Sequence, residues 1–306
     1  MITYNGSVLK VGSNWLKTDV DYNPLNLPPH TIRVQFVEGV TPTFQYGTAV
    51  QVSSSPNVWD VTCENTWNNG GWANLFSNQT ALVSILGANA SGIQNFGAMC
   101  SGCTSLTTVA NFDVSTAVLF DEVFRDCTSL TTIPANFNTS SMCHELDNLF
   151  RGCTSLTTTP TFSDTTMVHN WDYMYMDCPI TTAPVYDLSC TAYDITTTGM
   201  FYGCSYLTVA PALNTANVTD MSLMFQDCTS LTAVPLYNTT RVSNVHSMFG
   251  SCVNVQTGSL DLYTQMSTQE TPPAEHGLCF SNCGNNTVTG AAELAQIPQS
   301  WGGTAT

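Results

Sequence analysis

The stretch CTSLTT at residues 103–108 returns unchanged at 127–132 and at 153–158, and it returns as CTSLTA at 228–233. A catalytic motif is needed once, so recurrence at a near-constant interval predicts a structural unit that is copied along the chain. Equivalent cysteines lie 24 to 26 residues apart, at Cys103, Cys127, Cys153, Cys178, Cys204, Cys228 and Cys252. Cys283 follows after 31 residues, and Gln79 stands 24 residues before Cys103, which gives nine units.

Each unit carries apolar residues at the same distances from its cysteine. In one unit these residues are Val218, Met221, Met224, Phe225, Leu231 and Val234, around Cys228. Steps of three and four before the cysteine are typical of one face of a short helix, and the β-branched segment after it favours a short strand. A unit this small cannot bury its own apolar face, so neighbours must stack and share one core. We therefore predict an elongated α/β solenoid of about nine units of 24–26 residues.

The best-preserved unit, NVTDMSLMFQDCTSLTAVP at residues 217–235, resembles a known repeat. It is similar to the 26-residue repeats of bacterial surface proteins, which belong with the BspA-type leucine-rich repeats. The resemblance covers residues 72–290, although the unit around Cys178 is one residue short after its cysteine. It implies a leucine-rich-repeat solenoid and a role in binding other surfaces, and it implies no enzyme activity.

The ends of the chain divide into four further segments. Asn5-Gly6 lies between two short apolar runs, which is a strong hairpin signal, so residues 1–17 are predicted to form a β-hairpin anchor. The proline-bearing residues 18–30 read as a linker, and residues 31–71 as a small β-rich N-terminal cap with strands at 32–36 and 49–52. The array then occupies residues 72–290. Residues 291–306 are predicted to cap its other end through Leu294, Ile297 and Trp301.

The opening segment NGSVLKVGSNWLK, at residues 5–17, is similar to the start of structural proteins in phages of gut bacteria. Neither cap needs this hairpin, so it is free to attach the protein to something else. The resemblance implies attachment to other virion proteins, through Tyr4, Asn5, Gly6, Val8, Leu9 and Trp15.

Charge limits the partners of the chain. Six Lys and Arg against 22 Asp and Glu give a formal net charge of −16 over 306 residues. This charge opposes binding to phosphate backbones and to anionic lipid. The sequence shows neither a membrane span nor a signal peptide. We therefore expect no nucleic-acid partner, no membrane insertion, and folding in the cytoplasm.

Thirteen cysteines would suggest disulfides in a secreted chain. Eleven of them fall in columns that hold Phe, Val or Met in other units, so we predict small buried hydrophobes in the reduced form. Cys63 and Cys190 lie outside these columns, and their redox state stays open. Cys100 and Cys103 make a C-x-x-C, the pattern of a redox pair or half a zinc site, but both already serve as core positions.

His144 and His169 take equivalent positions in adjacent units, about 5 Å apart across the stack. Two histidines alone make a weak metal site, and surface or partly packed histidines are the other interpretation.

Asp121, Asp147 and Asp172 form a column of like charges that suits calcium. However, Arg125 and Arg151 follow the first two of these residues by four positions, where helical pairing supplies a partner, so ordinary surface ion pairs are the favoured explanation of the column. We predict no metal and no cofactor.

Threonine pairs after the cysteines place a column of hydroxyl groups along the predicted strand surface. Its members are Thr107, Thr108, Thr131, Thr132, Thr157, Thr158 and Thr232. Hydroxyl groups on an extended face suit hydrogen bonds to a glycan or a peptide. The alternative is that threonine favours strands and keeps the face soluble.

The chain contains no G-x-S-x-G, H-E-x-x-H, P-loop or dinucleotide-binding glycine signature, and spacing singles out no carboxylate pair for glycosidase chemistry. We therefore predict that the protein is not an enzyme. The leading hypothesis is a virion structural protein, a tail or capsid appendage that contacts host-surface glycans or proteins and neighbouring virion proteins. The alternatives are a bacterial cell-surface adhesin of the same repeat class and a glycan-cleaving enzyme. Whether the protein forms a homo-oligomer stays open.

Overall fold

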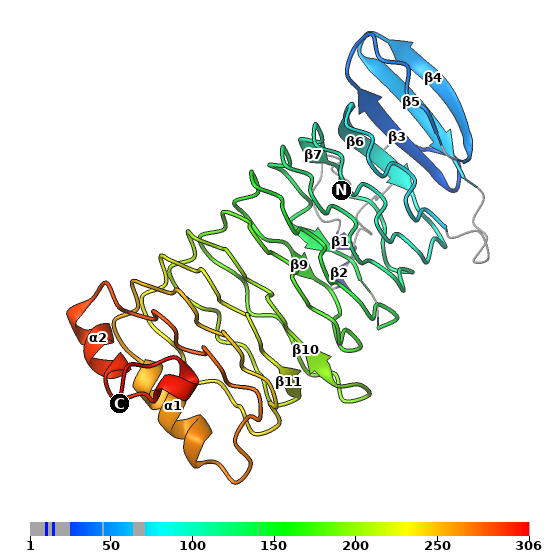
Figure 1. The fold of residues 1–306 in the computed structure, drawn as a ribbon. Coiled ribbons are helices and arrows are strands. Elements are labelled where there is room, and N and C mark those ends of the chain that lie inside the picture. Colours follow the sequence, from blue (N-terminus) through cyan, green and yellow to red (C-terminus); the bar gives the residue numbers. More distant parts are fainter. Residues whose placement is uncertain are drawn as a thin grey trace.

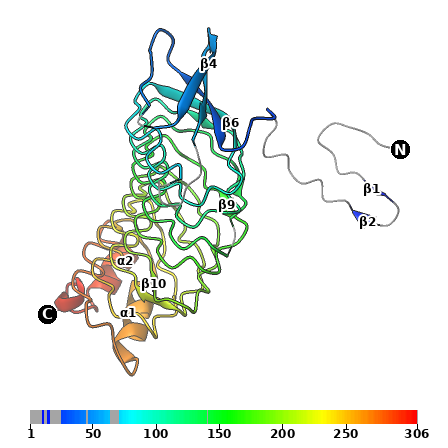
Figure 2. The same ribbon diagram turned by 90° about the vertical axis from the view of Figure 1, so that its right-hand side faces the viewer.

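The structure is a computed structural model that describes residues 25–44, 46–63, 71–139 and 141–305, together with the backbone of residues 10–11 and 14–15. Figures 1 and 2 show an elongated body in which successive turns of the chain lie side by side from one end to the other. A β-sheet lies at the N-terminal end of this body, and two helices lie at the opposite end.

The N-terminal sheet has five strands in the order β4-β5-β3-β6-β7. They are β3 (Thr31–Phe36), β4 (Thr48–Ser54), β5 (Asn57–Thr62), β6 (Leu82–Asn89) and β7 (Thr108–Val109). β3 buries Ile32, Val34 and Phe36, so it shows the alternation of a strand with one face on the core. β6 pairs with β3 in the antiparallel sense and with β7 in the parallel sense, so it joins the sheet to the turns that follow.

Backbone hydrogen bonds join each turn of the chain to the next. We use the word rung for the stretch around one cysteine position, from eight residues before it to six after it. Four alternate amides of one rung donate to four carbonyl groups of the following rung. In the rung of Cys103 the donors are Phe96, Ala98, Cys100 and Gly102, and the acceptors are Leu119, Asp121, Val123 and Arg125, at 2.7 to 3.0 Å. Neighbouring rungs are therefore held in register by their backbones.

The segment before each cysteine is a series of turns rather than the predicted helix. Its intervening amides bond within the rung to the third residue before them, as Met99 does to Phe96 O at 3.0 Å. Five residues before the cysteine position, the backbone is left-handed in every rung: Asn74, Ala98, Glu122, Asn148, Tyr173, Gly199, Leu223, Ser247 and Leu278. One residue before it, the same holds for Asn78, Gly102, Asp126, Gly152, Asp177, Gly203, Asp227, Ser251 and Asn282. A right-handed helix cannot contain a left-handed residue at every fourth position.

The predicted α/β solenoid of leucine-rich-repeat type is therefore wrong. In the described part of the chain the α-helices are α1 (Ser259–Thr268) and α2 (Val288–Leu294), followed by the 3-10 helix η2 (Gln299–Trp301). The other strands are short: β1 (Lys10–Val11), β2 (Asn14–Trp15), β8 (Asn136–Phe137), β9 (Thr161–Phe162), β10 (Ile195–Thr196) and β11 (Val218–Asp220). They form separate two-stranded sheets, β1-β2 antiparallel and β8-β9 and β10-β11 parallel. Helix and strand do not alternate along the array.

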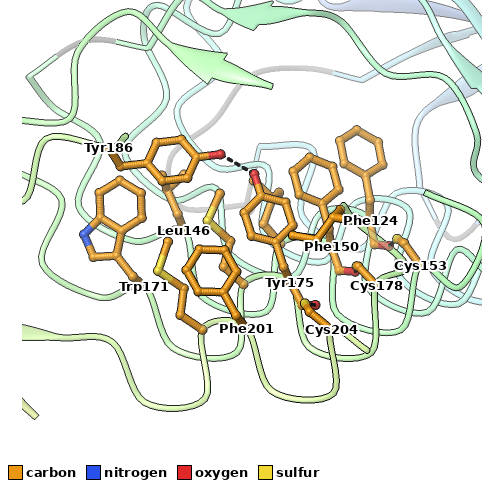
Figure 3. Close-up of a cluster of buried hydrophobic side chains, with 14 of the residues drawn as sticks. Phe124, Leu146, Phe150, Cys153, Trp171, Tyr175, Cys178, Tyr186, Phe201 and Cys204 are labelled. Carbon is orange, nitrogen blue, oxygen red and sulfur yellow. Dashed lines mark hydrogen bonds between the residues drawn. The ribbon is translucent and has the colours of Figure 1, made fainter. Parts of the chain in front are cut away.

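Aromatic rings form a continuous column through the interior. The rings of Phe124, Phe150, Tyr175, Phe201, Phe225, Phe249 and Phe280 stack in this order, with centroids 5.2 to 6.3 Å apart and planes within 14° of parallel. Figure 3 shows part of the column. Such offset stacking adds to the stabilisation that these buried rings supply by leaving water.

The cysteines line the same interior. All thirteen are free and buried, so the prediction that their columns are buried is confirmed. The structure adds a hydrogen bond, because each thiol of the column from Cys103 to Cys252 donates to a carbonyl group of the preceding rung. Cys153 Sγ lies 3.0 Å from Phe124 O, and Cys178 Sγ lies 3.0 Å from Phe150 O. A buried carbonyl oxygen thereby gains a second partner.

The predicted end segments are described in part. Leu294, Ile297 and Trp301 are buried at the C-terminal end, where His276 stacks on Trp301 with ring centroids 4.2 Å apart. At the N-terminus the structure places Trp15 by its backbone in β2. The other residues of the predicted anchor, Tyr4, Asn5, Gly6, Val8 and Leu9, lie outside the described residues.

Candidate functional site

The predicted threonine face is exposed over adjacent rungs. Thr108 pairs with Ser84 on one side and with Thr132 on the other, both in the parallel sense. Thr108, Thr131 and Thr132 are exposed, while Thr107 is partly buried. The structure therefore brings the first four predicted site residues together as one row on the surface.

Two hydroxyl groups of this row donate hydrogen bonds between rungs. Thr107 Oγ1 donates to Val83 O at 3.1 Å, and Thr131 Oγ1 donates to Thr107 O at 3.2 Å. A hydroxyl group that donates still has lone pairs for accepting a hydrogen bond. Thr107 and Thr131 can therefore act toward a ligand as acceptors, while their protons stabilise the stack.

The remaining threonines lie farther along the molecule. Thr157 and Thr158 are exposed in the next rung. Thr232 lies three rungs beyond them, donates to Thr208 O at 3.2 Å, and lines a hollow of about 120 Å³ together with Thr208 and Val209. The structure thus separates Thr232 from the other predicted site residues.

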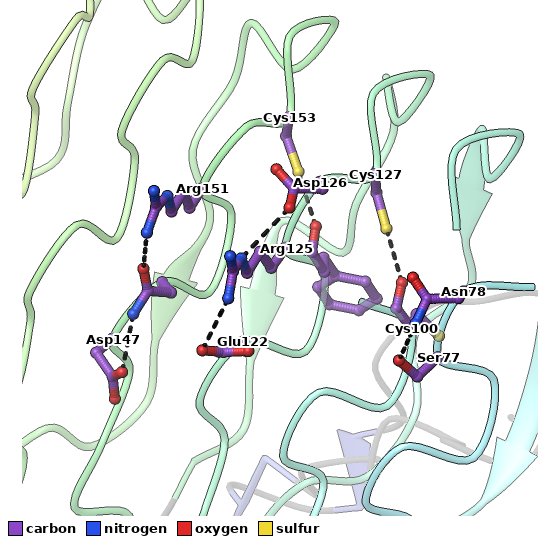
Figure 4. Close-up of polar contacts among 12 residues, drawn as sticks. Ser77, Asn78, Cys100, Glu122, Arg125, Asp126, Cys127, Asp147, Arg151 and Cys153 are labelled. Atoms are coloured by element: carbon purple, nitrogen blue, oxygen red, sulfur yellow. Dashed lines mark hydrogen bonds and ion pairs between the residues drawn. The ribbon is translucent and has the colours of Figure 1, made fainter. Parts of the chain in front are cut away.

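The predicted ion pairs of the aspartate column are wrong. Arg125 pairs with Glu122 at 3.2 Å and with Asp126 at 3.3 Å, rather than with Asp121. In the next rung Arg151 donates to an amide oxygen, Asn148 Oδ1, at 3.3 Å, rather than to an aspartate (Figure 4). The physical reason is the left-handed residue in each segment, because it breaks the helical geometry on which ion pairs between residues four apart depend.

Burial and crowding of carboxylates disfavour charge in this column. Burial raises the pKa of Asp147 to about 6, and the nearby carboxylates of Asp121 and Glu145 add to this shift. Burial also raises the pKa of Asp121 and that of Asp172. Among the described residues, no group of three or more His, Cys, Asp or Glu is placed to hold a metal ion. The three aspartates of the column are therefore not arranged as one group of metal ligands.

The two histidines form an aromatic cluster with a third residue. The ring centroids of His144 and His169 lie 5.9 Å apart, and Tyr193 packs on both, at 5.8 Å and 4.5 Å. Sequence reasoning missed Tyr193 because it lies in the loop after Cys190, outside the repeated pattern. The cluster favours partly packed surface histidines over a metal site.

The buried thiols are not suited to nucleophilic chemistry. Burial raises the pKa of Cys63 to about 11 and that of Cys283 to about 12. Burial also raises the pKa of Cys100 well above its ordinary value. The thiolate is the reactive form, so these residues serve packing. Among the described helices, none has both the length and the apolar character that crossing a membrane requires.

Comparison with known proteins identifies a family. The family model described as "Mycoplasma protein of unknown function, DUF285" matches residues 72–188 and 187–270, which together exceed half of the chain. The chain belongs to this family. Comparisons with curated proteins and with solved structures gave no match.

This result corrects the resemblance drawn from the sequence. The repeated region matches the DUF285 model, and no BspA-type or leucine-rich-repeat family was detected. The spacing of Met, Phe, Cys and Leu that suggested those families is explained here by successive turns, whose apolar side chains also recur at intervals of three and four residues.

Proposed function

We propose that this protein is a non-enzymatic component of a virion, a tail or capsid appendage that uses its long array to contact a host surface or neighbouring virion proteins. The observation that carries the proposal is the exposed, in-register row of Thr108, Thr131 and Thr132 on an elongated body. A row of hydroxyl acceptors at regular spacing is suited to a repetitive polar partner, such as a glycan chain. The virion setting rests on the expectation, drawn from the hairpin signal at Asn5-Gly6, that the N-terminus is free to attach the protein to other virion proteins.

The charge of the chain supports a restricted set of partners. A net charge of −16 favours neutral or cationic surfaces and opposes nucleic acid and anionic lipid. No metal cluster and no reactive thiol among the described residues supplies a catalytic group. The proposal therefore rests on contact rather than on turnover, and it leaves open whether one copy or several act together.

The first experiment tests whether the protein is part of a phage particle. Mass spectrometry of purified phage particles should detect the intact chain. Its detection only in bacterial envelopes would overturn the virion proposal.

Binding by the threonine face is tested with substitutions on its surface. Thr131→Lys and Thr157→Lys should weaken binding to host cells, because each places a long charged side chain on the exposed row. Thr271→Lys is the control, because Thr271 is also exposed but lies beyond α1, away from the row. Unchanged binding by the first two variants would remove this face from the proposal.

A second candidate function is a bacterial cell-surface adhesin. The description of the family names a Mycoplasma protein, and this supports a cellular setting. The same location experiment separates the two, since an adhesin is recovered with cell envelopes and not with particles. A glycan-cleaving enzyme is the weakest alternative; it predicts that changing one or two carboxylates abolishes turnover without unfolding the protein.

A further inference from the structure

At the position of β9 the backbone hydrogen bonding does not continue to the following turn of the chain, although the rungs of Cys153 and Cys178 remain bonded to each other. On one side β9 pairs with β8, through Thr161 N to Ala135 O and Ser163 N to Phe137 O, both at 2.9 Å. On the other side lies the segment 184–187, which follows the rung that is one residue short after Cys178. Within the described chain no backbone hydrogen bond joins β9 to this segment. Strand β9 therefore has an open edge in the middle of the array.

Side chains hold the two segments together in place of the backbone. Tyr186 Oη donates to Pro160 O at 3.0 Å, and Thr165 Oγ1 donates to Asp187 O at 3.0 Å. The Tyr186 ring is buried, and its hydroxyl group also contacts that of Tyr175 at 2.5 Å (Figure 3). The gap is thus a fixed feature of the packing.

The gap forms the larger of the two hollows described here, with a volume of about 310 Å³. Its apolar lining comes from Phe162 and Tyr186, whose ring centroids lie 5.8 Å apart, and from the exposed Val185. Its polar lining comes from Thr161, Ser163, Asp164, Thr165, Thr166 and Asp187. The partly buried Phe162 and the exposed Val185 thus lie beside a set of hydroxyl and carboxylate groups, with the buried Tyr186 behind them.

The polar groups of the groove are chiefly acceptors. The hydroxyl groups of Thr161 and Ser163 donate to β8, at 3.3 Å to Ala135 O and 3.1 Å to Phe137 O. Asp164 Oδ1 accepts from the amide and the hydroxyl of Thr166, at 2.9 and 2.7 Å. The carboxylate of Asp187 is exposed. A ligand that fits must therefore supply donors, carry no negative charge, and place an apolar face against Phe162 and Val185.

We propose that this groove binds one or two rings of a neutral or amine-bearing sugar. A sugar ring has hydroxyl donors around its edge and C–H groups on its face, which match the acceptors and the apolar surface of Phe162 and Val185. The volume lies at the lower end of the roughly 300–1,000 Å³ of small-molecule sites. A peptide strand fits less well, because strand addition depends on main-chain hydrogen bonds and β9 spans only Thr161–Phe162. The inference rests on the contact function proposed above and names its ligand.

The test uses the full chain and a panel of free sugars, with saturation-transfer NMR as the readout. The panel holds galactose, N-acetylglucosamine and glucosamine, with a sialic acid as the anionic control. We expect transfer to a neutral or amine-bearing sugar and none to the sialic acid. No transfer to any sugar at millimolar concentration would overturn the proposal, as would transfer to the sialic acid alone.

Two tryptophan substitutions locate the binding site. Val185→Trp should fill the groove and abolish transfer, whereas Val209→Trp should leave it intact. The two valines are matched, at 66% and 67% exposed, and Val209 lines the hollow near Thr232 instead. Binding that survives Val185→Trp refutes the groove as the site. Binding that is lost only in Val209→Trp assigns the sugar to the other hollow and refutes it too.

A charge-neutral substitution tests the acceptors. Asp187→Asn keeps the shape of the side chain and should weaken sugar binding about tenfold, as expected for loss of a hydrogen bond to a charged group. An unchanged affinity refutes the proposed acceptor role. If an extended peptide binds and is blocked by Val185→Trp while no sugar binds, the site is a peptide site and the proposal fails. Sugar binding by the purified chain does not depend on its detection in particles, so the two proposals fail separately.

Discussion

Replacing Ala98 with glycine should stabilise the protein, although the same change destabilises a helix. Ala98 lies five residues before Cys103 and has a backbone φ of 53°. A side chain with a Cβ pays roughly 1–2 kcal/mol in this left-handed region, and glycine does not. Glycine in turn has more conformational freedom than alanine in the unfolded chain, and this lowers the free energy of unfolding by roughly 0.5–1 kcal/mol. The difference predicts that Ala98→Gly raises the free energy of unfolding by about 0.5–1 kcal/mol.

The matched control is the same substitution in a true helix. Ala292 is exposed within α2, so Ala292→Gly should lower the free energy of unfolding by about 0.5–1 kcal/mol. Had the sequence-based helix been present before Cys103, Ala98→Gly would show this negative sign as well. The two interpretations therefore differ in sign and not only in size.

The assay is thermal unfolding of both variants beside the parent chain, followed by circular dichroism and calorimetry. The midpoint should rise by about 1–3 °C for Ala98→Gly and fall by a similar amount for Ala292→Gly. A fall in both variants would refute the left-handed turn as the conformation of this segment.

Three further predictions follow from the packing of the rungs. Gly152→Ala should destabilise the protein by more than about 1 kcal/mol, because a Cβ at φ 72° would overlap Asp126 Oδ1. Adding Asp126→Gly should recover part of this loss in a double-mutant cycle, and the absence of any recovery would show that the overlap is not its cause. Cys153 should react with iodoacetamide at least about a hundredfold more slowly in the folded protein than in urea, because burial raises its pKa. Equal reaction rates in the two conditions, measured by mass spectrometry, would contradict its burial. Asp147 has a pKa of about 6 in the folded protein against an ordinary value of 3.8, so the folded state holds its proton more tightly and the free energy of unfolding of the parent should fall as the pH rises from about 4 through 6. Asp147→Asn should have a higher free energy of unfolding than the parent above pH 6 and the same value below pH 4. A difference that persists at low pH would rule out ionisation as its origin.

The periodicity of the sequence determined which side chains are buried and where each rung begins. Cys127, Phe124 and Leu130 stand at repeated positions and are all buried, because any stacked array of small units must bury the same columns. This inference needs only the interval between equivalent residues. It does not depend on the local conformation of the backbone.

The local conformation was decided by tertiary contacts. Apolar steps of three and four residues fit a helix and fit consecutive turns equally well, so the pattern alone could not distinguish them. In the structure alternate amides donate to the next rung, and this is incompatible with hydrogen bonds to the fourth residue before them. Left-handed Ala98 and Glu122 are unfavourable in isolation and are held by these bonds between rungs.

The candidate sites divide in the same way. The threonine row could be predicted because Thr108 and Thr132 occupy equivalent positions, and equivalent positions meet when rungs stack in register. The groove could not be predicted, because it depends on the side chains that line the space beside β9, Phe162, Val185 and Tyr186 among them, which do not belong to the repeated columns. A sequence repeat specifies what is common to all rungs, whereas a space left beside one strand is fixed only by the packing of side chains in three dimensions.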